Sequence, residues 1–383
     1  MEEWAAACGV QRADGFQLTS EDGVDVSVMT TQDLAAESPV LFVPGEMILS
    51  SSRAVQEFGR LEAAEKLING LNVSDQIRQF YLMLKILFEY EKGEESPWFP
   101  WLNSLPRYFS NGAAMTTFCY ECLPPLVASL AMEERSNLMR MDVIKVPFLS
   151  EETKRNKDLI KWAFQIVYTR SFEVNDAPGD LRIVPMADMF NHGTDTEVAL
   201  VYDDNGNCYA RTTRDVPAGS PLRMSYGDPT NPSFLLARYG FVDESSPATF
   251  CKIMIPHINS QLKDIGYAHN RMLFYKDSGE VSEEVWDVLL FQILSSSNAA
   301  RRREFYKAHI NGDYETKQAF HQDFWPETSA KLKEHLDTFL RQLDELSAKV
   351  YGKNRNEHPR LPLIVKHNEF VRNTFLKVRD RYF

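Results

Sequence analysis

The chain of 383 residues has no long apolar run, no surplus of positive charge and no basic leader. Without a run of about 18 apolar residues it cannot form a membrane-spanning helix. The formal charge of -12 and the pI of about 5.3 exclude nucleic acid as the main partner, because phosphate binding needs a cationic surface. The first residues, Met1-Glu2-Glu3-Trp4, lack the basic start of a signal peptide. We therefore expect an intracellular protein, in the cytoplasm first, with the plastid and the nucleus as open alternatives.

Cysteine is scarce as well, and the common signatures of catalysis are missing. The five cysteines form no disulfide ladder, which indicates a reducing compartment. Cys119 and Cys122 form a single CxxC without a second pair, so we interpret them as structural rather than as a redox or metal site. The sequence holds no Walker GxxxxGK(S/T), no GxGxxG that opens a helix and no GxSxG. Because His192 has no HExxH partner or cysteine cluster beside it, we expect no metal.

What the sequence does contain begins with a change of hydrophobic period. The first 50 residues include short alternating or apolar runs that are typical of strands, at Gln17–Ser20, Val24–Val28 and Pro39–Pro44. From residue 52 the spacing becomes helical. A link rich in proline and tryptophan, at 96–106, interrupts this helical block. A long helix is predicted to begin near Ser150 and to end at Arg170.

Strands return in the second half of the chain, and helices follow them. Asn205-Gly206 is a strong hairpin signal between the predicted strands 198–202 and 208–212. After Asp243 the spacing is helical again, at 282–297, 299–309 and 328–351. We predict an α+β protein with its best domain break near 245–255. Its four parts would be an N-terminal β region (1–51), a helical insert (52–170), a second β region (171–245) and a helical domain (246–383).

Two irregular segments, 182–192 and 224–242, combine apolar residues with asparagine, histidine, tyrosine and glycine. A lone buried tyrosine or histidine is usually structural, with its polar atom satisfied by a neighbour. Here, however, Asp188 precedes Asn191-His192 at close spacing, and Tyr226-Gly227 comes before Asn231 and before Tyr239-Gly-Phe241. A simple apolar core has little need of this set of polar residues, so we interpret the two segments as halves of one site.

These segments resemble the SET-domain methyltransferases, in the branch that holds the Rubisco large-subunit lysine methyltransferase and the actin-histidine methyltransferase. The branch pattern is approximately P-x-x-D-x-x-N-H-S, then Y-G-x-x-S-N-x-x-L-x-x-x-Y-G-F. This chain departs from it with Gly193 and Thr230 in place of serine. The resemblance implies small curled β sheets with a pseudoknot, a helical insert and a C-terminal helical domain that docks a protein substrate. It also implies a monomer that transfers a methyl group from S-adenosylmethionine, without metal, and releases S-adenosylhomocysteine.

The resemblance also assigns roles to individual residues. Arg170 stands where the family binds the cofactor's carboxylate, which suits a guanidinium. The family's positions for the cofactor's amine and adenine fall on Asp188, Asn191 and His192. Tyr226 matches the catalytic tyrosine, which also borders the cofactor. Phe172 and Tyr239 match an aromatic channel for the substrate lysine, where desolvation favours the neutral amine.

Two further positions bear on activity and on the target residue. The family's N-terminal G-x-G falls on Asp25 and Ser27, or on Gly23-Val24-Asp25 if the hairpin is longer, so Asp25 would line the cofactor site. The alternatives are therefore an active enzyme and a weak or inactive SET-fold binding protein. The histidine methyltransferase has asparagine and tryptophan where this chain has Phe172 and Ala187. We expect a protein-lysine N-methyltransferase acting on a non-histone protein, with a protein-histidine methyltransferase as the rival.

Overall fold

The computed structural model describes residues 1–20, 25–62, 65–66, 68, 76–139, 143, 145–173 and 179–383. The chain forms two compact units. Unit 1 comprises Met1–Phe109 and Glu133–Tyr226, and unit 2 comprises Ser110–Met132 and Gly227–Phe383. Since compactness divides the chain differently from the four parts expected from the sequence, those four boundaries stay predictions.

The described residues of unit 1 form four small sheets in its β half. The largest has the order β1-β4-β10-β9, and it is built from β1 (Gln11–Arg12), β4 (Pro39–Val43), β9 (Val198–Tyr202) and β10 (Cys208–Thr212). The hairpin between β9 and β10 turns at Gly206, whose φ of 76° favours glycine, as Asn205-Gly206 predicted. The other three sheets pair β2 (Phe16–Thr19) with β3 (Ser27–Thr30), β8 (Asn191–His192) with β11 (Arg223–Met224), and β7 (Leu181–Ile183) with both β5 (Leu49–Ser50) and β6 (Phe172–Glu173).

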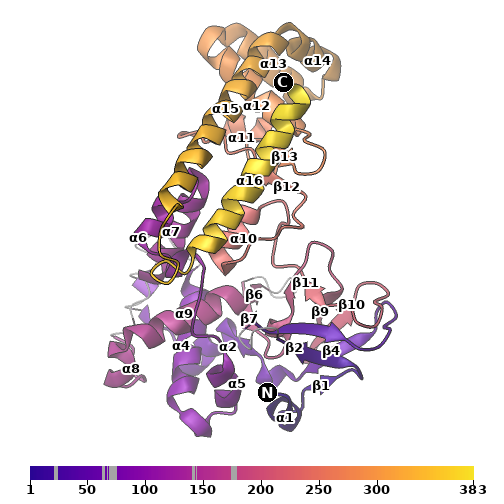
Figure 1. Cartoon of the computed structure of the whole chain (residues 1–383). Coiled ribbons are helices and arrows are strands. Elements are labelled where there is room, and N and C mark those ends of the chain that lie inside the picture. Colours follow the sequence, from indigo (N-terminus) through magenta and orange to yellow (C-terminus); the bar gives the residue numbers. More distant parts are fainter. Residues whose placement is uncertain are drawn as a thin grey trace. The chain divides into compact units, whose positions relative to one another are not determined.

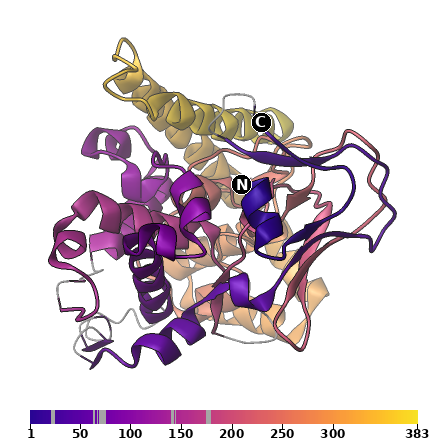
Figure 2. The same ribbon diagram turned by 90° about the horizontal axis from the view of Figure 1, so that it is seen from below.

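Helices form the other half of unit 1, and Figures 1 and 2 show them on one side of the strands. They are α2 (Ser51–Phe58), α4 (Gln76–Glu91), α5 (Phe99–Ser104), α8 (Glu151–Arg155) and α9 (Lys157–Arg170), and α1 (Glu2–Ala7) lies at the N-terminus. The central α4 packs against α2 and α9. Most of α4 is buried, from Phe80 to Leu87, so this helix is the core of the insert.

The predicted helix from Ser150 to Arg170 is two helices, so that prediction was wrong in its middle. Ser150 caps α8, because its hydroxyl accepts a hydrogen bond from the backbone N–H of Thr153. Asn156 caps α9 in the same way, accepting from the N–H of Leu159 at 3.0 Å. The asparagine therefore starts a new helix within the polar stretch that precedes the apolar face of α9. The predicted strand at Val24–Val28 also differs: β3 begins at Ser27, and Val24 lies outside the described residues.

Unit 2 is helical apart from one antiparallel pair, β12 (Ala248–Phe250) with β13 (Leu273–Tyr275). Its helices are α6 (Thr117–Glu121), α7 (Pro125–Met139, which begins in this unit), α10 (Pro232–Tyr239), α11 (Ser260–Ile265), α12 (Glu283–Ser297), α13 (Ala299–Asn311), α14 (Tyr314–Asp323), α15 (Trp325–Val350) and α16 (Leu361–Tyr382). The long α15 and α16 run side by side (Figure 1). The predicted helices at 282–297, 299–309 and 328–351 are confirmed as α12, α13 and α15.

The cysteine pair of the CxxC is buried in unit 2. Cys119 and Cys122 are 1% and 0% exposed within an apolar cluster, which fits the structural interpretation. Among the residues that the structure describes, no group of acidic, histidine and cysteine side chains is arranged to hold a metal ion. In the same part of the chain, no helix has both the length and the apolarity that crossing a bilayer requires.

Candidate active site

A short parallel pairing joins the two motif segments in unit 1. Strands β8 and β11 align Asn191 with Arg223 and His192 with Met224. The buried carboxylate of Glu197 holds this pairing, since it accepts from the backbone N–H, Nε and Nη2 of Arg223 at 3.1, 3.0 and 2.9 Å. Burial raises the pKa of Glu197, but the bonds from Arg223 outweigh it, and the net shift is downward. The carboxylate therefore stays ionised and fixes Arg223, the β11 residue that pairs with Asn191.

The same pairing explains why glycine replaces serine at position 193. The N–H of Gly193 donates to the carbonyl of Met224 at 3.0 Å, which continues the ladder. A Cβ at this position would lie 3.0 Å from the Cβ of Arg223 and 3.1 Å from its Cδ. Because Arg223 is tied to Glu197, it has little freedom to move away. The glycine is thus the local consequence of this chain's Arg223–Glu197 pair.

Tyr226 is held at its backbone and at its hydroxyl. Its N–H donates to Nδ1 of His192 at 3.0 Å, and its phenol donates to the carbonyl of Phe190 at 2.6 Å. An amide N–H only donates, so Nδ1 is an acceptor and the neutral imidazole carries its proton on Nε2. With its proton directed at Phe190, the phenol oxygen turns its lone pairs away from that carbonyl. The backbone and the hydroxyl of Tyr226 are therefore both fixed by the segment 190–192.

Arg170 and Asp188 form a second fixed pair. Nη1 of Arg170 donates both to the carbonyl of Asp188, at 2.9 Å, and to its Oδ2, at 2.8 Å. Burial raises the pKa of Asp188, the Arg170 guanidinium opposes this shift, and the indole of Trp101 also faces the carboxylate. The Asp188 side chain has no exposed surface. It is thus placed to hold Arg170, and its predicted contact with a cofactor stays a prediction.

The backbone just before Asp188 has an unusual conformation. Met186, just before the 3-10 turn Ala187–Met189, has a φ of 72°, a left-handed conformation that costs a non-glycine residue energy. The turn is closed by the N–H of Asp188 on the carbonyl of Val184, at 3.0 Å. This turn lets the chain present the Asp188 carbonyl to Arg170 and then enter β8 at Asn191.

The end of the β2–β3 hairpin meets Asn191. The Nδ2 of Asn191 donates to the carbonyl of Val26 at 3.2 Å and to Oγ of Ser27 at 3.0 Å. Asp25 is exposed and directly precedes these two acceptors. The departure from G-x-G at Asp25 and Ser27 is therefore adjacent to a predicted cofactor residue. The alternative position Gly23-Val24 lies outside the described residues.

The two predicted channel residues lie in different units. Phe172 is on β6 of unit 1, and Tyr239 is the last residue of α10 in unit 2, so the channel stays a prediction. The neighbouring motif residues shape α10: the side chain of Asn231 caps its start, accepting from Phe234. Gly240 ends it with a φ of 84°, and a Cβ there would lie 2.6 Å from the backbone nitrogen of Asn111. Both residues are thus needed structurally, whatever their further role.

Sequence reasoning missed the main-chain acceptors and the buried anchors of this site. The carbonyls of Phe190 and Val26 receive Tyr226 and Asn191, but a carbonyl leaves no trace in residue identity. Glu197 and Trp101 were not singled out, because an isolated glutamate or tryptophan carries no spacing signal. Arg170, Asp188, Asn191, His192 and Tyr226, all from the predicted set, do fall in unit 1 with these contacts.

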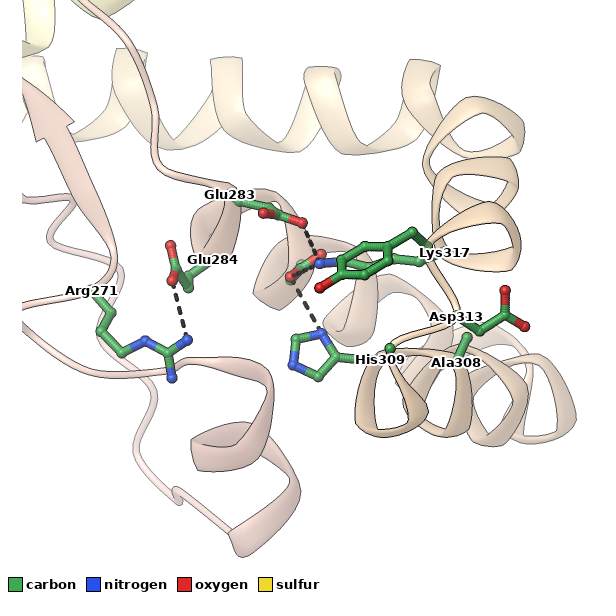
Figure 3. A pocket seen from close by; sticks show the side chains of 10 residues that line it. Arg271, Glu283, Glu284, Ala308, His309, Asp313 and Lys317 are labelled. Atoms are coloured by element: carbon green, nitrogen blue, oxygen red, sulfur yellow. Dashed lines mark hydrogen bonds and ion pairs between the residues drawn. The ribbon is translucent and has the colours of Figure 1, made fainter.

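Unit 2 contains a cavity of about 210 Å³ between α12, α13 and α14 (Figure 3). Asp287, which is 1% exposed, receives Lys317 Nζ at 2.6 Å and His321 Nε2 at 2.7 Å. Arg271 bonds Glu284 at 3.1 Å across the same cavity. Because these charges neutralise one another, we interpret the residues that line the cavity as an ion-pair network. This network connects the three helices.

Comparison with known proteins shows a fold similar to that of SET-domain structures. No family model matches the chain. Structures of Rubisco LSMT superpose over the whole chain: the form bound to AdoMet has a TM-score of 0.60 at 16% identity and is covered to 90%, and the form bound to methyllysine and AdoHcy has a TM-score of 0.61 at 15% identity and 90% coverage. The chain thus has the SET-domain fold of this branch, as the sequence predicted.

The sequence relatives come from the same branch. The actin-histidine N-methyltransferase of Danio rerio is 24% identical over 263 residues, which are 63% of this chain and 42% of that protein. The SET domain-containing protein 4 of Artemia parthenogenetica is 26% identical over 182 residues, 44% of this chain and 45% of its own length. The chain therefore spans less than half the length of these two curated relatives. The resemblance stated from the motifs is confirmed at the level of branch and fold.

Proposed function

We propose that this chain is a protein methyltransferase that uses S-adenosylmethionine, and that its target is a lysine of a non-histone protein. The observation that carries the proposal is Tyr226, whose hydroxyl is fixed by the Phe190 carbonyl next to the paired Asn191-His192 segment. The AdoMet and AdoHcy bound to the similar LSMT structures, and the methyltransferases among the sequence relatives, support it.

The residues of unit 1 fit the charged end of this cofactor. Both contacts of Arg170 with Asp188 use Nη1. The Nε and Nη2 groups do not bond Asp188 and can donate to the carboxylate of a ligand. Asn191 donates through Nδ2, which leaves its Oδ1 to accept from an ammonium group. An anion site and an acceptor of this kind match the two ends of an α-amino acid. We infer that Arg170, Asn191 and His192 hold the cofactor, and that Asp188 keeps Arg170 in place.

When bound, S-adenosylmethionine supplies an electrophilic methyl group on its sulfonium. The task of the protein is then to orient a neutral amine in line and to exclude water. Tyr226 suits this task because the Phe190 carbonyl accepts its proton and so fixes the direction of the phenol, whose oxygen would accept from the attacking amine. Phe172 follows Arg170 by two residues in the sequence. It would give the attacking amine an apolar wall, which disfavours the protonated form of the amine.

Lysine is preferred to histidine on the residues of this chain. Ala187 is 0% exposed, so the tryptophan that the histidine enzyme carries at this position would have to displace packed neighbours. The curated relatives that act on actin histidine keep the rival open as the second candidate. Mass spectrometry of a substrate protein incubated with the enzyme separates the two, and methyl-histidine alone would overturn the lysine assignment.

Calorimetry with S-adenosylhomocysteine distinguishes the enzyme from the alternative, an inactive SET-fold binding protein. We expect saturable binding, because the anion site and the Asn191 acceptor are preformed. No heat at millimolar ligand would refute the enzyme and leave a SET-fold binding module.

We further propose that the chain acts as a monomer in the cell interior and that unit 2 docks the protein substrate. The net negative charge of the chain suits a protein partner and not nucleic acid.

A further inference from the structure

Ser27 stands where the resemblance expects a glycine, and its hydroxyl contacts Asn191. We propose that Ser27 is a positioning residue: it fixes the orientation of the Asn191 amide so that Oδ1 is presented to the cofactor's α-ammonium group. This inference rests on the proposed function and adds to it a residue that the family pattern does not contain.

The hydrogen bonds of Asn191 determine which way its amide faces. The carbonyl of Val26 only accepts, so it must meet the nitrogen, at 3.2 Å. The hydroxyl of Ser27 receives the second hydrogen of the same nitrogen, at 3.0 Å. With both Nδ2 hydrogens engaged on the hairpin, the amide cannot rotate to offer its nitrogen elsewhere. The oxygen is then the atom that the side chain presents to a ligand.

The backbone that carries Ser27 is itself fixed. Ser27 pairs with Thr19 in the β2–β3 ladder. One residue on, the carbonyl of Val28 accepts from the N–H of Leu222 at 2.8 Å, which ties the hairpin to the segment that leads into β11. Asn191 is held from the other direction by its pairing with Arg223. The two side chains therefore meet from strands whose register is already set, so the hydroxyl has a defined partner.

A glycine at position 27 would act differently. It would remove the hydroxyl and leave Asn191 only the Val26 carbonyl, so the amide would lose one of its two restraints. It would also open space next to the hairpin, which is what the family pattern provides. If closer backbone approach governs affinity, the glycine variant binds the cofactor more tightly than the natural chain. If orientation of Asn191 governs it, the same variant binds more weakly. The two explanations predict opposite signs.

The test compares two ligands by titration calorimetry on the full chain. S-adenosylhomocysteine carries the α-ammonium and carboxylate, whereas 5′-methylthioadenosine keeps the adenosine but lacks this amino-acid end. We expect Ser27→Ala and Ser27→Gly to weaken S-adenosylhomocysteine binding about three- to ten-fold, the range for one neutral hydrogen bond. Binding of 5′-methylthioadenosine should stay unchanged.

Two further variants provide the controls. Thr31→Ala removes another hairpin hydroxyl, which donates to the carbonyl of Gly15 at 3.3 Å, and it should leave both affinities unchanged. Ser27→Ala should add little loss when Asn191 is already alanine, because the serine acts through it. Equal weakening of both ligands, no weakening, or tighter binding by Ser27→Gly would each overturn the inference. If the natural chain binds 5′-methylthioadenosine but not S-adenosylhomocysteine, the inference fails; if it binds neither, the proposed function fails with it.

Discussion

Lys252 in unit 2 is a buried cation whose removal should stabilise the protein. The residue is 4% exposed, and its Nζ donates to the hydroxyl of Ser233 at 2.6 Å. The same hydroxyl lies 3.1 Å from Nε2 of His367, which is 0% exposed. Burial, and then the charge of Lys252, lower the pKa of His367 to about 3, so this imidazole stays neutral and accepts. The ammonium of Lys252 thus meets a neutral cluster.

The magnitude follows from the pKa of Lys252. Burial lowers it from 10.5 to about 7. Each unit of difference between the folded and unfolded pKa is worth about 1.4 kcal/mol, so the protonated form costs the folded state roughly 4–5 kcal/mol at most. The unfolded chain binds the extra proton between pH 7 and pH 10.5, so stability rises with pH across this window and the full cost applies below it. Lys252→Met keeps most of the volume and removes the charge.

We expect Lys252→Met to raise the unfolding temperature most at pH 6.5 and hardly at all near pH 10. A gain of 1 kcal/mol corresponds to about 2–4 °C in a unit of this size. Thermal unfolding followed by tryptophan fluorescence reports on unit 2 through Trp286 and Trp325, which pack together at 4.9 Å. Lys307→Met, at an exposed lysine of α13, is the matched control. A difference between variant and natural chain that does not change with pH would refute the reasoning.

Three other substitutions test the site and its support. Tyr226→Phe should keep the fold and the affinity for S-adenosylhomocysteine but lose about 100-fold or more in methyl transfer, since one aligned polar group is removed; full activity in a radiolabel assay would contradict the assignment. Asp188→Asn should weaken S-adenosylhomocysteine binding in calorimetry, because Arg170 loses its 2.8 Å ion pair; unchanged affinity would mean that the carboxylate does not position Arg170. Asp287→Asn should cost about 3 kcal/mol in urea unfolding, because Lys317 loses its buried partner and keeps only the more exposed Glu283; a loss below 1 kcal/mol would show that the network is not stabilising.

The sequence predicted the elements whose apolar pattern is clean and missed those whose buried side includes polar residues. Helix α15 was found from its regular apolar face. Helix α16 was not, because His367, Asn368 and Thr374 are all buried on it and interrupt the pattern. In α14 the buried side includes Lys317, which is tolerated there because Asp287 and Glu283 both pair with it. Pairings of this kind are tertiary, so no local window of sequence contains them.

The candidate site was predicted by resemblance and not by periodicity. Nothing in the spacing of Asn191 and Tyr226 shows that β8 and β11, two residues each, run parallel and adjacent. Strands this short have almost no propensity signal, and Arg223 of β11 is held by Glu197, a buried residue that lies outside both strands. The motif supplied the residues, and the structure supplied the reason for Gly193.

Three predicted site residues donate hydrogen bonds to main-chain carbonyls. This bears on the hairpin that departs from the family's G-x-G pattern. Tyr226 donates to the carbonyl of Phe190, Asn191 to that of Val26, and Arg170 to that of Asp188. A main-chain carbonyl persists whatever side chain its residue carries, so long as the backbone keeps its course. If the family's G-x-G falls on Asp25-Val26-Ser27, the hairpin still presents the Val26 carbonyl, because its register is set by β2 and by Leu222. The restraint on Asn191 therefore survives the exchange, and the added hydroxyl of Ser27 strengthens it.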